Sequence, residues 1–261
     1  LINLTTKEVT ELWKGYDAST LSSIGVNDVT DDGTIAVGEL NGKPADWKKS
    51  EGKFILLPLH SGCNSGYAKA VTPDGRFAIG TLSYIDNIFA EVPALWDLTT
   101  GQLLNTPGLP TKDMAHEDKE QNRFTDISAD GRYIVGCMSF SYLPTGDYIG
   151  GIFQYLYDRE KASYVAIGFN ESATAAWTPW VENLSFISTA TLSNNGLYVT
   201  GNAYLVEAIA GSNFPKETIL PYLYEVSTGR FQIFPDGAES GLGGWSVDNN
   251  GQIFAATPIS N

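Results

Sequence analysis

Residues 70–80 read AVTPDGRFAIG, and this stretch decides the fold. A run of alternating apolar residues leads into an Asp-Gly turn, and a second alternating run follows it. Glycine supplies the positive φ that a tight turn needs, and the aspartate before it tolerates the left-handed conformation. The stretch therefore predicts a β-hairpin.

The same hairpin pattern occurs five times along the chain. The other copies read DVTDDGTIAVG at 28–38, DISADGRYIVG at 126–136, TLSNNGLYVTG at 191–201 and SVDNNGQIFAA at 246–256. A second hairpin follows each of the first four copies, as in ALWDLTTGQLLNT at 94–106. Each full repeat thus supplies four short antiparallel strands, which is the content of one β-propeller blade.

We predict an all-β fold in which residues 1–261 form a single domain, a five-bladed β-propeller of four-stranded antiparallel blades. The expected blades span 26–58, 67–107, 124–168, 187–235, and 244–261 combined with 1–12. The last copy stops after two strands, but LINLTTKEVT at 1–10 matches LWDLTTGQLL at 95–104 position for position. Pairing of residues 1–12 with 244–259 would close the last blade and leave no open sheet edge. The alternative is a segment cut from a longer repeat array, because terminal repeats are often atypical.

Residues 72–101 resemble the blade motif of WD-repeat propellers and of TolB-type PD-repeat propellers, in the pattern [S/T]-x-D-G…G…W-D-x-x-T-G. The bacterial extracellular HAF repeat is similar. The resemblance covers nearly the whole chain but concerns architecture, and it implies a propeller that binds proteins or glycans through its faces without a shared set of catalytic residues. The sequence departs from the WD pattern at Lys48, Tyr157 and Tyr224, and it lacks the Gly-His pair that many WD repeats carry.

Composition limits the partners. The chain carries 30 acidic and 16 basic residues, a net charge of -14, which disfavours nucleic acid and anionic membrane surfaces. No apolar stretch has the length of a membrane span, so we expect no membrane insertion. Few lysines and cysteines with many Gly, Asn, Tyr and Trp residues suit a bacterial exported protein that is secreted, periplasmic or at the cell surface. We expect a monomer.

Long connections are predicted on one face of the blades, because the turns within each hairpin are tight. Long loops on a rigid scaffold are where binding residues concentrate. Flat aromatic rings beside polar groups suit a protein or carbohydrate ligand. The predicted ligand-binding residues are Trp13, Tyr16, His60, Tyr67, His116, Trp177, Trp180 and Trp245. An alternative for Trp177 and Trp180 is that they cap the gaps between blades.

No metal or cofactor is predicted. His116-Glu117-Asp118 lies in a charge-rich stretch that is better interpreted as a solvated loop, and Asp31-Asp32-Gly33 is explained by turn chemistry. Cys63 and Cys137 do not have metal-binding spacing, and Cys137 follows a strand pattern that indicates a buried thiol.

The predicted function is a non-catalytic binding or scaffold propeller that presents a loop-rich aromatic face to a protein or carbohydrate ligand. The alternative is a glycoside hydrolase or lyase that uses Asp28 and Asp126, which share the first position of the innermost strand in two repeats. These carboxylates would instead serve structure if they accept hydrogen bonds from the backbone of a neighbouring blade, and nothing else in the sequence completes a catalytic site.

Overall fold

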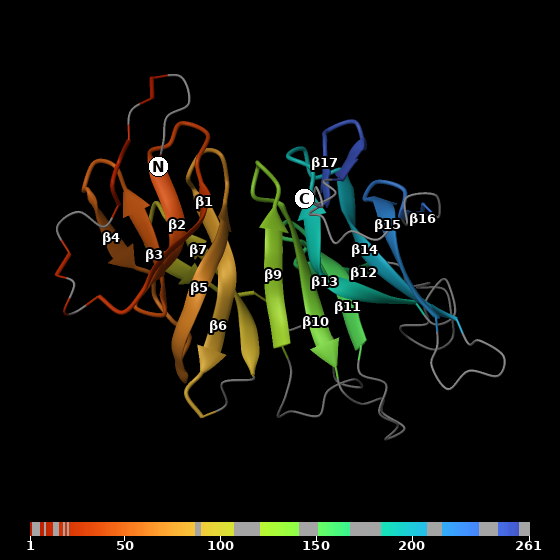
Figure 1. Ribbon diagram of the computed structural model, residues 1–261, viewed down its shortest axis with the longest axis horizontal. Helices are drawn as coiled ribbons and strands as arrows, with labels where there is room; N and C mark the ends of the chain where they lie inside the picture. Colours follow the sequence, from red (N-terminus) through yellow and green to blue (C-terminus); the bar gives the residue numbers. More distant parts are fainter. Residues whose placement is uncertain are drawn as a thin grey trace, which may run out of the picture. The chain divides into compact units, whose positions relative to one another are not determined.

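The structure is a computed structural model that describes residues 1, 6–7, 9–12, 16–17, 19, 21–86, 90–106, 121–140, 151–167, 184–207, 216–234 and 245–255. All regular secondary structure in these ranges is β-strand (Figure 1). The strands divide into two compact units: β1 to β8 with the beginning of β9 form one, and the remaining strands form the other.

The first unit contains two antiparallel meanders, which we call blades 1 and 2. Blade 1 consists of β1 (Ile24–Val29), β2 (Ile35–Leu40), β3 (Lys43–Lys48) and β4 (Lys53–Leu56), paired in that order. Blade 2 consists of β5 (Cys63–Val71), β6 (Phe77–Tyr84), β7 (Glu91–Asp97) and β8 (Gln102–Leu104), also paired in chain order. The beginning of β9 is attached to this unit by one parallel pair, Gln121 with Glu91 of β7.

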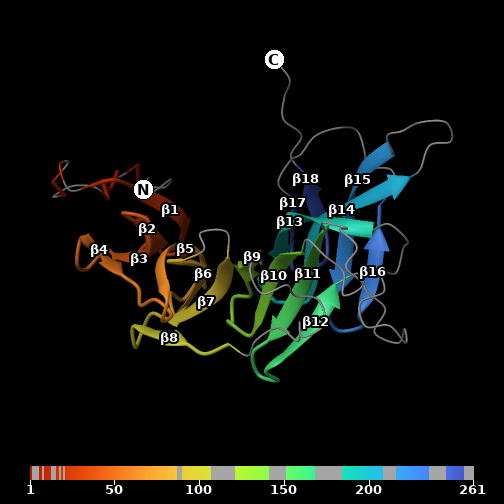
Figure 2. The ribbon, with the colours of Figure 1, turned by 90° about the horizontal axis from the view of Figure 1, so that it is seen from below.

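The second unit repeats the arrangement. Blade 3 consists of β9 (Gln121–Ile127), β10 (Tyr133–Phe140), β11 (Gly151–Asp158) and β12 (Ser163–Ile167), which lie side by side in Figure 2. Blade 4 consists of β13 (Leu184–Leu192), β14 (Tyr198–Glu207), β15 (Lys216–Glu225) and β16 (Arg230–Ile233). β17 (Trp245–Val247) pairs with β18 (Ile253–Ala255) at the fifth sequence copy. The repeated four-stranded antiparallel meanders confirm the predicted all-β architecture.

The first hairpin of each blade is capped by its own side chains. In blade 2 the Thr72 hydroxyl donates to Asp74 Oδ1 at 2.6 Å and accepts the Phe77 amide at 3.0 Å. Asp74 also accepts the amide of Arg76 at 3.0 Å. Because the turn satisfies its own backbone groups in this way, a hydroxyl-x-Asp-Gly or hydroxyl-x-Asn-Gly pattern recurs from blade to blade.

A β-bulge in the second half of the first strand explains a second repeated glycine. The pairing register shifts between Val26 and Asp28 in blade 1, and an equivalent shift occurs in blade 2. A Cβ atom at Gly38 of β2 would lie 2.0 Å from the carbonyl oxygen of Gly25. At Gly80 of β6 the same atom would lie 2.1 Å from the carbonyl oxygen of Tyr67. Only glycine allows this close approach of the two strands.

Apolar side chains fill the space between consecutive blades of each unit. Val37 of β2 belongs to one buried cluster with Ala78, Leu82 and Trp96 of blade 2. In the second unit, the equivalent cluster joins Val135 and Leu156 of blade 3 to Val199, Ala203 and Tyr222 of blade 4. The blades therefore stack through their apolar faces, as the alternating pattern predicted.

Candidate functional site

The carboxylate of Asp28 links blade 1 to blade 2. Its Oδ1 accepts the amide of Val29 at 2.8 Å, and its Oδ2 accepts the amide of Val71 in β5 at 2.9 Å. Asn27 adds a second link, because its side-chain amide donates to the carbonyl oxygen of Ala68 at 2.7 Å. Burial raises the pKa of Asp28, although the hydrogen bonds from Val71 and Val29 oppose that rise.

Asp126 repeats this arrangement between blades 3 and 4. Its Oδ1 accepts the amide of Ile127 at 2.8 Å, and its Oδ2 accepts the amide of Leu192 in β13 at 2.8 Å. The neighbouring Thr125 hydroxyl donates to the carbonyl oxygen of Ala190 at 2.9 Å. Both carboxylates therefore make the contacts to the next blade that a structural role requires.

The residue type at this repeat position alternates along the chain, so each aspartate serves its own blade and the next. Blades 1 and 3 carry Asp28 and Asp126, whereas the same position holds Ala70 in blade 2 and Thr191 in blade 4. The amide that follows Ala70 is bound by the carboxylate of the preceding blade, and so is the amide that follows Thr191. These residues join the first strands of consecutive blades in pairs.

Three of the predicted ligand-binding residues lie wholly within the described part of the chain. The Tyr16 hydroxyl accepts the amide of Phe54 at 2.6 Å, and the two rings have centroids 6.5 Å apart. Tyr16 thus packs against blade 1 and covers the outer strand β4. His60 lies in the connection between blades 1 and 2, and Tyr67 lies in β5 opposite Thr81; both are half-buried. His60 therefore precedes blade 2, whereas Tyr67 belongs to its first strand.

The remaining predicted residues cannot be compared with the structure. Trp13, His116, Trp177 and Trp180 lie outside the described residues. Trp245 begins β17, but its side chain is also outside what the structure describes. Their role in ligand binding stays a prediction.

An exposed apolar pair at the end of β6 was missed by the sequence analysis. The side chains of Tyr84 and Ile85 are 37% and 56% exposed, and Asp86 beside them is exposed as well. The amide of Ile85 donates to the carbonyl oxygen of Gly62 at 2.9 Å, and the amide of Tyr84 donates to that of Ala90 at 3.3 Å. The backbone on both sides thus holds this end of the strand in place.

The connection that follows β6 carried a signal in its sequence. It reads YIDNIF from Tyr84 to Phe89, with one charged residue among four large apolar ones. Surface connections are usually polar, so an apolar connection of this kind indicates contact with something else. It does not repeat from blade to blade, and for that reason the search for repeats passed over it.

A charged pair lies next to this end of blade 2. Glu91 at the start of β7 pairs with Ser83 across the sheet and forms an ion pair with Arg123 of β9. Arg123 also donates to the side-chain oxygen of Gln121 at 2.9 Å. The positive charge of Arg123 is therefore balanced by Glu91, whereas the carboxylate of Asp86 faces solvent.

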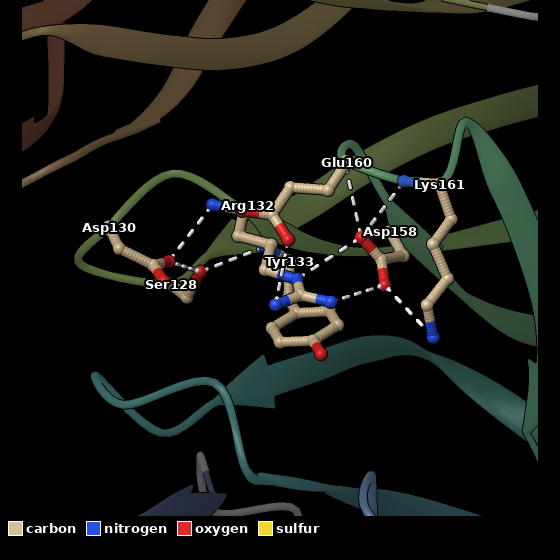
Figure 3. A network of polar contacts seen from close by, with 7 residues as sticks. All are labelled: Ser128, Asp130, Arg132, Tyr133, Asp158, Glu160 and Lys161. Atoms are coloured by element: carbon tan, nitrogen blue, oxygen red, sulfur yellow. Dashed lines mark hydrogen bonds and ion pairs between the residues drawn. The ribbon is translucent and has the colours of Figure 1, made fainter.

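A second polar cluster lies at the two tight turns of blade 3, between β9 and β10 and between β11 and β12 (Figure 3). Its contacts are all within the blade, which indicates a structural role. The Arg132 guanidinium donates to both oxygens of Asp158, at 3.2 and 3.0 Å, and contacts Glu160 at 2.8 Å. Asp158 also accepts the amide of Glu160 at 3.0 Å. Burial raises the pKa of Asp158, but the hydrogen bonds from Arg132 and the backbone outweigh it, and the pKa lies below its usual value. The cluster joins the two hairpins of the blade.

The described residues contain no group of three or more His, Cys, Asp and Glu side chains that could hold a metal ion. Cys63 and Cys137 are both buried free thiols. In the same part of the chain, no helix has the length and apolar character needed to cross a membrane.

Comparison with known proteins returns propeller structures. No protein-family model matches the chain, and no curated protein matches it. A TolB structure from Acinetobacter baumannii is 21% identical with a TM-score of 0.49, over 91% of this chain and 49% of that one. The β-propeller domain of the Trilobed protease from Pyrococcus furiosus is 10% identical with a TM-score of 0.45, over 89% and 64%. An oligogalacturonate lyase in complex with manganese is 12% identical with a TM-score of 0.35, over 81% and 64%. The chain thus spans about half the length of the TolB structure.

Proposed function

We propose that the chain is a non-catalytic binding or scaffold propeller that presents its loop-rich face to a protein or carbohydrate ligand. The observation that carries this proposal is the hydrogen bonding of the Asp28 and Asp126 carboxylates. Each binds two backbone amides with its two oxygens, one of them in the next blade. Because both oxygens of each carboxylate are held by the backbone of two consecutive blades, these contacts favour a structural role.

The second candidate is a glycoside hydrolase or lyase that uses Asp28 and Asp126. One observation favours it, because the raised pKa of Asp28 is what a general acid requires. In such a glycoside hydrolase, the distance between the two carboxyl groups would determine the stereochemical outcome of hydrolysis. The hydrogen bonds to both oxygens of Asp28 argue for the first candidate.

Activity and binding assays separate the two candidates. Wild-type protein should bind a component of a glycan array or of an immobilised protein mixture, and replacing Trp177 and Trp180 by Ala should reduce that signal in a protein that stays folded. The wild type should release no product from a panel of polysaccharides. Turnover that disappears in both Asp28→Asn and Asp126→Asn would establish the enzyme instead.

The proposed binding face belongs to a single five-bladed ring whose last blade is closed by residues 1–12 with 244–259. Two hydrogen bonds of 2.8 Å between Leu1 and Thr10 support this, since they are those of an antiparallel pair. Leu12 is buried with Ala36 and Trp47 on the face of blade 1 that is turned away from the blade 2 cluster. That is the place where the preceding blade of a ring would pack.

A pair of cysteines tests the closure. In the match of residues 1–10 with 95–104, Leu1 is equivalent to Leu95, and in the hairpin copies Ala255 is equivalent to Ile79. Because Leu95 pairs with Ile79 in blade 2, Leu1 is expected to lie opposite Ala255. A protein with Leu1→Cys and Ala255→Cys should form an internal disulfide on mild oxidation. The control pair, Leu1→Cys with Phe254→Cys, places the second thiol on the other face of the strand and should stay reduced. Equal cross-linking of both pairs, or of neither, would count against the closure.

We place the protein as a monomer outside the cytoplasm, secreted, periplasmic or at the cell surface. The support is compositional: a net charge of -14, few lysines and two cysteines. Native mass spectrometry at micromolar concentration should show one chain, and fractionation of the producing cells should recover the protein outside the cytoplasm. A dimer or a cytoplasmic protein would overturn the corresponding statement.

A further inference from the structure

Tyr84 and Ile85 differ from the other exposed apolar residues of the chain. Eight large hydrophobic side chains are exposed among the described residues, and Tyr84 and Ile85 are the only two that are adjacent in sequence. A single exposed hydrophobic residue is normal on a protein surface, whereas these two lie together beside Gly62, which the Tyr84 ring and the Ile85 amide both contact. Their position at a strand end also places them on the face where the binding residues are proposed.

The backbone around this pair is fixed. A Cβ atom on Gly62 would lie 3.5 Å from Cδ1 of Tyr84, so the ring lies against the connection between blades 1 and 2. The Ile85 amide bonds to the same glycine, and the Tyr84 amide bonds to Ala90. Ordering these side chains in a complex would therefore cost little backbone entropy.

The chemistry of the pair favours a protein ligand over a glycan. Ile85 offers aliphatic surface and no hydrogen bond, which suits an apolar side chain better than sugar hydroxyls. Asp86 beside it adds an exposed negative charge, and Arg123 of β9 is already paired with Glu91. The chain as a whole carries a net charge of -14. The complementary partner is cationic.

We infer that the end of β6 formed by Tyr84, Ile85 and Asp86 is a docking site for a basic polypeptide segment that inserts one apolar side chain between its positive charges. This inference rests on the proposed binding function and specifies its ligand class. The apolar anchor packs on Tyr84 and Ile85, while flanking Lys or Arg residues interact with Asp86. The site is separate from Asp28 and Asp126.

Amide chemical shifts of the full isotope-labelled chain test this site with three synthetic heptapeptides. The first has one phenylalanine between pairs of lysines with glycine at each end, the second replaces phenylalanine by alanine, and the third replaces the lysines by glutamates. The first peptide should shift the amides of Gly62, Tyr84, Ile85 and Asp86 in a saturable way. The alanine peptide should bind about fivefold more weakly, and the glutamate peptide should leave these amides unchanged.

Matched variants assign the two parts of the interaction. Ile85→Ala should weaken binding of the phenylalanine peptide about fivefold, whereas Leu56→Ala, at another exposed aliphatic residue, should not. Asp86→Lys should weaken it about threefold or more, with an effect that shrinks at high salt, and Glu51→Lys should not.

Several results would overturn the inference. They are the absence of saturable shifts, equal binding of the phenylalanine and alanine peptides, shifts located elsewhere, or full binding by Ile85→Ala. Larger shifts of the same amides with cellohexaose than with the peptide would assign the site to a glycan; that result would leave the proposed binding function intact. Polysaccharide turnover would instead contradict the proposed function itself.

Discussion

At the scale of single residues, the aspartates that were candidates for catalysis are the ones that join blades. Asp28 and Asp126 each accept two backbone amides, one from their own first strand and one from the first strand of the next blade. An unpaired buried amide costs about 1–3 kcal/mol, so a single side chain at this position stabilises two blades. Carboxylates at equivalent repeat positions are therefore not by themselves evidence of an active site.

Asp28→Asn should destabilise the protein by about 1–3 kcal/mol, because an asparagine has one acceptor oxygen and its NH₂ group would face the second backbone amide. Urea unfolding measures the change. Asp31→Asn is the matched control, since Asp31 is exposed in the following turn and loses the same charge. Similar stabilities of the two variants would contradict the linking role.

Asp158→Asn should show a pH-dependent loss of stability. The pKa of Asp158 is lowered in the folded protein, so its contribution is fully present above the unfolded value of about 3.9 and disappears as pH falls through the folded value. Urea unfolding should give a deficit of about 1–3 kcal/mol at pH 7 that shrinks progressively as the pH falls below the unfolded value of about 3.9. Glu160→Gln, whose side chain is 67% exposed and contacts the same Arg132, should cost less than about 1 kcal/mol at either pH. A pH-independent deficit in Asp158→Asn would contradict this account.

At the scale of the elements, the tight turns also set the contact between blades. A Cβ atom at Gly75 would lie 2.6 Å from Cδ1 of Ile35 in blade 1, and at Gly196 it would lie 2.6 Å from Cδ2 of Tyr133 in blade 3. The turns of blades 2 and 4 thus pack against the residue that begins the second strand of the preceding blade in the same unit. Turn and packing constrain the same glycine.

Gly196→Ala and Gly33→Ala separate these two constraints. Both glycines have positive φ, +73° and +68°, but nothing lies within 4 Å of a Cβ atom at Gly33. Gly33→Ala should cost about 1 kcal/mol for backbone strain, whereas Gly196→Ala should cost about 2–4 kcal/mol because the Tyr133 ring must also move. Equal losses in urea unfolding would mean that the turn conformation alone selects glycine.

The tryptophans of the third strands give a second comparison. Trp96 donates its indole N–H to the carbonyl oxygen of Pro58 at 2.8 Å, which ties the connection between blades to the core. Trp47 is equally buried, but its indole N–H has no partner among the described residues. Trp96→Phe should therefore be more destabilising than Trp47→Phe by about 1–2 kcal/mol in thermal or urea unfolding. The reverse order would show that packing volume outweighs the hydrogen bond.

The sequence predicted what repeats and little of what does not. The Asp-Gly turns, the four strands of each blade and the hydrogen-bonding alternative for Asp28 follow from spacing, because each depends on backbone geometry that recurs from blade to blade. Tyr84 and Ile85 occur in one connection only, and their exposure depends on how that strand end lies against Gly62. Tyr16 was predicted to bind a ligand, but its hydroxyl accepts the amide of Phe54 and its ring packs against the outer strand β4. Spacing alone did not reveal this contact.

At the scale of the whole molecule, the proposal is a ring of rigid blades that binds a ligand through its connections. Within each unit, apolar side chains pack the two blades together, and most of the residues proposed to bind a ligand lie in the connections between strands. A function located on such connections tolerates variation without loss of the fold. On this proposal, the chain retains the blade pattern while the residues proposed to bind its ligand do not repeat.

The most direct test of the central claim is hydrogen exchange of the Val71 and Leu192 amides in Asp28→Ala and Asp126→Ala, measured together with product release from polysaccharides. Each substitution should accelerate exchange of its own partner amide by at least about tenfold, because the carboxylate that binds the amide is gone. Product should be absent in all forms, the wild type included. Unchanged exchange, together with a wild-type activity that either substitution abolishes, would contradict the assignment of these aspartates to structure.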